Sequence, residues 1–167
     1  MQLGIVSDTH DNLDHVRAAV AHFEAAGVDR VIHCGDIIAP FSATPFDTDS
    51  FAFDAVRGNN DGEWGLTEVV DEFGTYHGEF AELTVDGVDI AVYHGTSTAL
   101  REALADAGEY DYVFHGHTHE HTIETHGDTV RVNPGGLPIP GADDTFHVVT
   151  LDTEESGVDA ITQHKLE

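Results

Sequence analysis

The fold follows from residues 1–36, MQLGIVSDTHDNLDHVRAAVAHFEAAGVDRVIHCGD. Residues 2–7 form a short apolar run, typical of a buried strand, that ends at Ser7-Asp8. From Asn12, a plausible N-cap, apolar residues recur at helical spacing as far as Gly27, and residues 28–34 form a second apolar run. This order predicts a strand–helix–strand unit with a right-handed crossover.

The rest of the chain mixes further strands with hairpins. Residues 51–56 and 112–114 predict strands and residues 97–107 a helix, whereas residues 37–50 predict a loop with at most one helical turn. Alternating apolar residues around Asp86-Gly87 predict a hairpin, and two more hairpins should turn at 127–128 and near 155–157. We therefore predict an α/β fold with two stacked, mixed β-sheets flanked by helices, in a single domain spanning residues 1–167.

The composition is strongly acidic. The chain has 32 acidic residues against 6 basic ones, for a formal net charge of -26, and Asp and Glu are spread along it. A binding tail for a cationic partner would carry its charge in blocks, so we favour the alternative, a cytoplasm with molar salt in which self-repulsion is screened. The same balance argues against a nucleic-acid partner, which needs a basic stripe for phosphate contacts.

Cysteine content and hydrophobic segments predict the compartment. Cys34 is the only cysteine, so no internal disulfide can form, which suits a reducing environment. The N-terminus lacks a basic region followed by an apolar run, and no segment is apolar enough to span a bilayer. We expect a cytoplasmic protein with no membrane partner.

Five clusters of metal-ligand side chains follow the predicted strands. They are Asp8 with His10, Asp36, Asn59, His94, and His117 with His119. Side chains two residues apart on an extended chain project to the same side, so two clusters can each aim a pair at one point. Carboxylates, imidazoles and one amide oxygen suit Mn²⁺, Fe²⁺, Ni²⁺, Co²⁺ or Zn²⁺. Seven ligands exceed the need of one tetrahedral ion and suit two ions that share a bridging carboxylate.

These clusters and their glycines resemble a known family. The resemblance to the calcineurin-like metallophosphoesterase superfamily lies in the order Asp8-Thr9-His10, Gly35-Asp36, Gly58-Asn59, His94-Gly95 and Gly116-His117-Thr118-His119. The small, single-domain phosphodiesterase branch of this superfamily is similar at Val56-Arg57-Gly58-Asn59 and Asn133-Pro134-Gly135. The resemblance runs from Met1 to about Leu151, nearly the whole chain.

The resemblance implies a four-layer αββα sandwich with a dinuclear metal centre. One divalent ion, with Mn²⁺ the first expectation, would be held by Asp8, His10, Asp36 and His119. The other would be held by Asp36, Asn59, His94 and His117, so that Asp36 bridges the two. A hydroxide bridging the ions would attack the phosphorus of a small phosphate-ester substrate, in the first place a phosphodiester. Many relatives are dimers, so a homodimer also stays open.

At two positions the chain departs from the family pattern. Many members have His directly after the ligand Asn, whereas this chain has Asn60, which cannot act as a general acid at neutral pH. With Asp36, Asn59 and Asn60 as the catalytic residues, we predict a preference for activated diesters over alkyl monoesters. Gly136 stands where the Asn-Pro-Gly motif commonly continues with Ser, so a hydroxyl contact is missing.

Two other functions stay open, a phosphomonoesterase and a metal-binding scaffold that recruits partners. The scaffold is less favoured because all the ligand positions are intact, and a nuclease of the superfamily would carry a basic surface that this chain lacks. We expect His15 and His22 to be solvated on the polar side of the first helix, and His33 and His115 to pack or hydrogen-bond behind the ligands. Arg57 could meet a phosphate or form a salt bridge.

Overall fold

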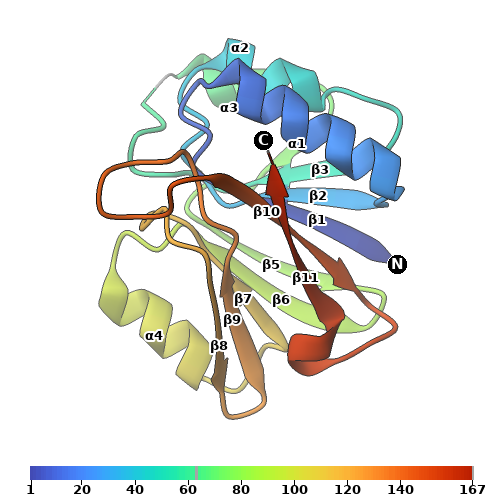
Figure 1. The fold of residues 1–167 in the computed structure, drawn as a ribbon, viewed down its shortest axis with the longest axis vertical. Helices are drawn as coiled ribbons and strands as arrows, with labels where there is room; N and C mark the ends of the chain where they lie inside the picture. Colours follow the sequence, from blue (N-terminus) through green and yellow to red (C-terminus); the bar gives the residue numbers. More distant parts are fainter. Residues whose placement is uncertain (63, 167) are drawn as a thin grey trace.

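The layers of the structure follow the predicted order. The computed structural model describes residues 1–62 and 64–166, and it contains two β-sheets stacked face to face with helices on both outer sides (Figure 1). The predicted α/β fold, a four-layer αββα sandwich of two mixed sheets, is confirmed. The prediction of one domain over residues 1–167 also includes residues 63 and 167, which lie outside the described residues.

The first sheet begins with the predicted strand–helix–strand unit. Its strand order is β11-β10-β1-β2-β3-β4, in which β1 to β4 are parallel and β10 is antiparallel to both of its neighbours. The strands are Gln2–Val6 (β1), Arg30–His33 (β2), Ala52–Ala55 (β3), Thr75–Tyr76 (β4), Phe146–Asp152 (β10) and Ile161–Leu166 (β11). The outer face is covered by α1 (Leu13–Ala26), α2 (Pro40–Ala43), the 3₁₀ turn η1 (Thr44–Phe46) and α3 (Gly65–Val70) (Figure 1).

The second sheet is also mixed, with strand order β5-β6-β7-β9-β8. Its three central strands are parallel, and β5 and β8 run antiparallel at the edges. The strands are Phe80–Val85 (β5), Val88–Tyr93 (β6), Tyr112–Phe114 (β7), Thr122–His126 (β8) and Thr129–Asn133 (β9). Helix α4 (Thr98–Asp106) lies on the outer side of this sheet (Figure 1), and the 3₁₀ turn η2 (Gly157–Ala160) precedes β11. All three predicted hairpins are confirmed.

Helix α1 forms where capping and periodicity predict it. The Asn12 side chain accepts a hydrogen bond from the backbone N–H of His15, and Gly27 ends the helix with a φ of 67°. Phe23 is fully buried beneath the helix, and burying such a ring stabilises the fold by roughly 2 kcal/mol. A Cβ at Gly4 of β1 would lie 2.6 Å from this ring, so only glycine lets α1 approach the sheet so closely.

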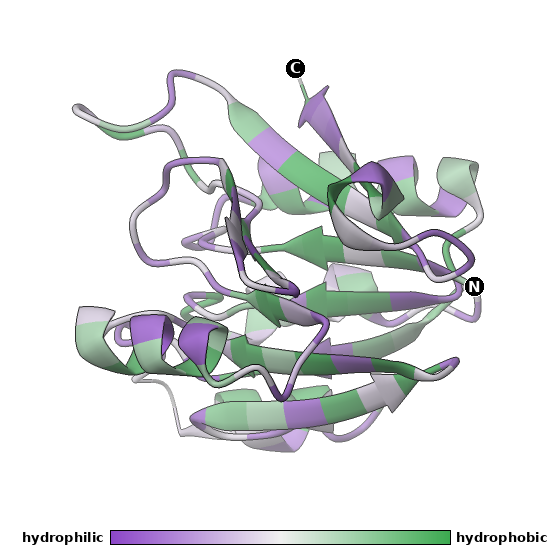
Figure 2. Ribbon diagram, turned by 90° about the horizontal axis from the view of Figure 1, so that it is seen from below, coloured by the Kyte–Doolittle hydropathy of each residue, from purple (hydrophilic) through white to green (hydrophobic). Residues whose placement is uncertain are grey.

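Two apolar cores separate the layers. Leu3 and Ile5 of β1 enter the core between the sheets, whereas Val6 enters the core beneath α1, because successive strand residues point to opposite faces. Figure 2 shows the strands as mainly hydrophobic and the connections as richer in hydrophilic residues. With both faces of the first sheet buried, polar groups gather in the loops beyond the strand ends, where sites form in α/β proteins.

Two short elements and two histidines differ from expectation. The sequence pattern does not predict α3 or β4, because six and two residues are too few to show a period. The expectation that His15 and His22 are solvated is wrong, because both are half-buried. The His15 ring stacks on Phe146 with centroids 4.5 Å apart, and the His22 ring lies 4.4 Å from that of His164.

Helix α4 forms as predicted, with Ser97 as its N-cap. Its apolar side is incompletely covered, since Leu100 is 56% exposed and the buried residue of the helix is Ala105. In the described part of the chain, no helix combines the length and the apolar character that crossing a membrane requires.

Candidate metal centre

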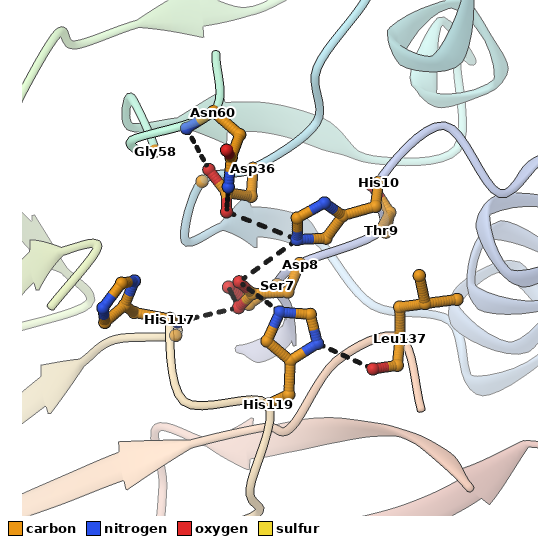
Figure 3. Close-up of polar contacts among 12 residues, drawn as sticks. Ser7, Asp8, Thr9, His10, Asp36, Gly58, Asn60, His117, His119 and Leu137 are labelled. Carbon is orange, nitrogen blue, oxygen red and sulfur yellow. Dashed lines mark hydrogen bonds and ion pairs between the residues drawn. The ribbon is translucent and has the colours of Figure 1, made fainter. Parts of the chain in front are cut away.

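Loops that follow five strands meet at one edge of the two sheets. Three ligand clusters follow β1, β2 and β3 of the first sheet, and two follow β6 and β7 of the second. The structure brings all seven predicted ligand residues together, although Asp8 and His117 are 109 positions apart. Figure 3 shows His10 and His119 pointing toward the Asp8 carboxylate, and the His10 nitrogen that faces Asp8 also faces Asp36.

Asp8 is fully buried at the centre of the cluster. Its Oδ2 accepts hydrogen bonds from Ser7 Oγ at 2.5 Å and from the backbone N–H of His117 at 2.9 Å. Its Oδ1 has no hydrogen-bond partner in the described residues and lies 3.4 Å from His119 Nε2 and 3.8 Å from His10 Nε2. An unpaired carboxylate oxygen in a buried position is costly, so this oxygen fits a bound cation.

Asp36 lies between two histidines from different sheets. Its Oδ2 is 3.3 Å from His10 Nε2 and 3.5 Å from His94 Nε2. Asn60 holds the same carboxylate, because its backbone N–H donates to Oδ1 and its Nδ2 donates to Oδ2, both at 2.8 Å. The predicted catalytic residue Asn60 therefore contacts Asp36 directly and fixes its orientation.

The remaining ligands surround the Asn59 side chain. Asn59 Oδ1 lies 3.0 Å from His94 Nε2 and 2.9 Å from His117 Nδ1. His94 Nδ1 donates to the Cys34 carbonyl at 2.8 Å, and His119 Nδ1 donates to the Leu137 carbonyl at 2.6 Å. These bonds place the proton of a neutral ring on Nδ1, so that the Nε2 lone pair is directed into the centre, as in metal-ligating histidines.

Donor atoms from the two sheets group closely enough to hold metal. One group of three comprises Asp8, His10 and His119, and a second comprises Asp8, Asp36 and His94, each with its ligand atoms within 4.8 Å of one another. The donor set of carboxylates and imidazoles suits divalent transition metals.

The Asp and His side chains of the cluster shift one another's pKa values. Burial alone would raise the pKa of Asp36, but the rings of His10 and His94 beside its Oδ2 outweigh this effect and hold the pKa below its ordinary value. The carboxylates of Asp36 and Asp8 beside its ring raise the pKa of His10 to about 9. In the metal-free protein, therefore, positive charge is attracted to the place where the sequence predicts cations.

The predicted ligand residues also have an unusual backbone conformation. Five ligand residues have positive φ, namely Asp8 (52°), His10 (44°), Asp36 (59°), His117 (72°) and His119 (60°). Non-glycine residues seldom adopt this left-handed region, and such strain concentrates at functional sites. The sharp turns let each loop leave its strand and aim a side chain at the common centre.

Glycines allow the loops to approach one another. A Cβ at Gly116 would overlap Ser7 Oγ and Asp8 Oδ2, and a Cβ at Gly136 would lie 2.5 Å from the Asp8 Cβ. The sequence marks Gly136 as a departure that lacks a hydroxyl. The structure shows that a side chain at this position would displace Asp8.

Two residues that hold the loops of the centre in place are not among the predicted ligands. Asp61 Oδ2 accepts the backbone N–H groups of Asp36 (3.0 Å) and Gly58 (2.7 Å), so it ties two ligand loops together. Asn133 Nδ2 donates to the Gly116 carbonyl and to Thr118 Oγ1, which fixes the loop that carries His117 and His119. The Asn-Pro-Gly motif marks Asn133 in the sequence, but the partners of Asp61 are set by tertiary structure alone.

His33 is buried behind the ligands, as predicted. Its Nδ1 accepts the Gly35 N–H at 3.1 Å, so in the neutral ring Nε2 carries the proton and donates to Thr9 Oγ1 at 3.1 Å. Burial lowers its pKa to about 3. This ring therefore joins the loops after β1 and β2 only while it is neutral.

His33 should make the protein sensitive to acid. As the pH falls from 6.5 toward 3, His33 becomes protonated in the unfolded chain but stays neutral in the folded chain. The free energy of unfolding therefore falls by about 1.4 kcal/mol per pH unit. His33→Gln removes this contribution, and its melting temperature should fall less steeply between pH 7 and pH 4 than that of the wild type. Parallel curves would contradict the assignment.

Comparison with known proteins agrees with this geometry. The family model of the calcineurin-like phosphoesterase superfamily domain matches residues 1–156. Phosphodiesterase MJ0936 of Methanocaldococcus jannaschii is 35% identical over 158 residues, which cover 87% of this chain and 93% of that protein. A probable metallophosphoesterase of Methanothermobacter thermautotrophicus is 29% identical over 174 residues, covering 96% of this chain and 92% of that protein.

Solved structures agree as well. An archaeal phosphodiesterase superposes with a TM-score of 0.88 at 33% identity, covering 99% of this chain and 100% of that one. YfcE, a phosphoesterase from E. coli, has a TM-score of 0.69 at 19% identity with full coverage of both chains, which shows the shared fold. The chain belongs to the calcineurin-like phosphoesterase superfamily, a family of hydrolases that act on phosphate esters.

Proposed function

We propose that this protein is a phosphodiesterase that works with two divalent ions at the candidate metal centre. The observation that carries the proposal is the position of Asp36, whose Oδ2 lies within 3.5 Å of Nε2 of both His10 and His94. One carboxylate is thus shared by the two predicted ligand sets. Asp8 Oδ1 and His10 Nε2, both buried without a hydrogen-bond partner in the described residues, are further support, since a cation would satisfy them.

The proposed ligand assignment is the one that the family resemblance implies, and the contacts of Asp36 with His10 and His94 support it. Asp8, His10, Asp36 and His119 would hold one ion, and Asp36, Asn59, His94 and His117 the other. When bound, such ions would lower the pKa of a water molecule and neutralise charge on the phosphate oxygens. The chain's own part is to orient Asp36 through Asn60, and to direct the Nε2 atoms of His94 and His119 inward.

A phosphodiester is the favoured substrate because the relative at 35% identity is named a phosphodiesterase. To test this, protein stripped by a chelator is reloaded with Mn²⁺ and assayed on bis(4-nitrophenyl) phosphate in molar KCl. We expect Mn²⁺ to restore hydrolysis and elemental analysis to find two ions per chain. Equal rates on 4-nitrophenyl phosphate would favour a phosphomonoesterase, and a metal-loaded but inert protein would favour the scaffold.

Asn60 should limit the leaving groups that the enzyme accepts. Its amide donates to Asp36 and cannot protonate a departing alkoxide. Asn60→His supplies a candidate general acid, so kcat/KM on a methyl diester should rise relative to that on the nitrophenyl diester by roughly 100-fold. The matched control Asn60→Gln keeps an amide and should leave this ratio unchanged. A ratio that stays the same in Asn60→His would remove the proposed role.

We also propose a cytoplasm with molar KCl as the working environment and Mn²⁺ as the resident ion. The net charge of -26 spread over the chain supports the salt, and the one buried cysteine supports a reducing compartment. The donor set of carboxylates and imidazoles supports a divalent transition metal such as Mn²⁺. Raising KCl from 0.01 M to 2 M shortens the Debye length from about 30 Å to below about 3 Å and screens carboxylate repulsion. The melting temperature should rise by about 5 °C or more, corresponding to roughly 2 kcal/mol. A flat or falling melting curve would rule out this adaptation.

A further inference from the structure

A cavity of about 550 Å³ is lined by Arg57 and Asp61, which flank the predicted ligand Asn59 in the sequence. Its size is typical of pockets for small molecules, roughly 300–1,000 Å³. The side chains that matter in its lining are Arg57, Asp61, Trp64, Tyr76 and Glu79. From these residues we infer that the cavity binds a flat aromatic group on the substrate, with Trp64 as the stacking surface. The inference rests on the proposed function, because it assigns an ester substituent of the phosphate to this cavity.

The cavity and the metal centre share one loop. Arg57 and Asp61 line the cavity, and the residues between them include the ligand Asn59 and the Asp36-binding residue Asn60. Asp61 also accepts the Asp36 backbone N–H at 3.0 Å. A phosphate held at the metal centre would therefore have one of its substituents beside this loop, at the entrance of the cavity.

Trp64 is the chain's only tryptophan and is 85% exposed. It immediately precedes α3, whose Leu66 and Val70 are buried in the core beneath the helices. A large aromatic side chain that lines a cavity offers a flat apolar surface on which a ligand ring can stack. Stacking on such a ring is strong and accepts different aromatic groups, because every flat aromatic group has a π-face.

The polar lining favours an uncharged ring over a second anionic group. The carboxylates of Asp61 and Glu79 both line the cavity and would repel an additional negative charge. Arg57 Nη1 lies 3.6 Å from Glu79 Oε1 in an exposed pair that contributes little to stability, so its guanidinium can turn toward the phosphate or the edge of a ring. Burial raises the pKa of Tyr76, whose phenol therefore remains a hydrogen-bond donor.

The test compares two competitors that differ only in an aromatic base, AMP and ribose 5-phosphate, as inhibitors of bis(4-nitrophenyl) phosphate hydrolysis by the Mn²⁺-loaded protein. AMP should bind roughly ten-fold more tightly than ribose 5-phosphate. Trp64→Ala should abolish this difference and Trp64→Phe should retain part of it. The control Leu100→Ala removes another exposed apolar side chain, on α4, and should leave the difference intact.

Fluorescence gives a readout that is independent of activity. With excitation at 295 nm, the signal of this protein comes from Trp64 alone, so AMP should change it and ribose 5-phosphate should not. Equal affinities of the two competitors in the wild type, or a difference that survives in Trp64→Ala, would overturn the inference while leaving the proposed function standing. If no diester is hydrolysed, the proposed function fails, and the fluorescence titration still decides whether the cavity binds the base.

Discussion

Asp36→Asn should lower kcat/KM on a phosphodiester by at least roughly 1,000-fold, equivalent to about 4 kcal/mol of transition-state stabilisation. The physical reason is that Asp36 Oδ2 lies between His10 and His94, where one carboxylate can serve both ions. An amide offers a single neutral oxygen and cannot bridge two cations. Elemental analysis of the variant should find fewer than two ions per chain.

The control for this variant is Asp49→Asn, which makes the same chemical change at an exposed position away from the centre. It should keep wild-type activity and metal content. Circular dichroism should show that both variants are folded, since an Asn at position 36 can still accept one of the two hydrogen bonds that Asn60 donates. Full activity in Asp36→Asn would mean that the chemistry does not depend on the proposed bridge.

Gly58→Ala should disable the centre although it replaces no predicted ligand residue. A Cβ at Gly58 would overlap both the Oδ1 atom and the backbone nitrogen of Asp36, so the loop carrying Asn59 must move away. Overpacking of this kind costs about 1–3 kcal/mol, which corresponds to a fall in melting temperature of roughly 5 °C. Because Asn59 moves with the loop, we expect kcat/KM to fall by about 100-fold.

Gly65→Ala is the matched control for Gly58→Ala. A Cβ there would meet Pro40 Cγ at 3.5 Å, an ordinary van der Waals contact, at the start of α3. Alanine is the better helix former, so the melting temperature should stay the same or rise slightly. If Gly58→Ala behaved like Gly65→Ala in melting temperature, metal content and activity, the close approach of the two loops would not be functionally required.

Much of the framework could be predicted from the sequence because the determining signals are local. The N-cap Asn12, the helical spacing up to Phe23 and the terminating Gly27 lie within one segment of the chain, and the structure confirms the helix they predict. Hairpins were likewise predictable, since Asp86-Gly87 suits the positive φ of a tight turn. Elements without such a local signal, α3 and β4, are too short to show a period.

The sequence by itself determined the candidate ligand types and their order along the chain, because each cluster directly follows an apolar strand and matches a family motif. Tertiary structure decided everything that depends on contacts between distant segments. Asn60 holds Asp36 from 24 residues away, and Asp61 ties the Asp36 and Gly58 loops together. The His15 ring stacks on Phe146 and is not solvated. Periodicity and turn chemistry describe only neighbours along the chain, whereas these partners meet only after the sheets have formed and their strand ends share one edge.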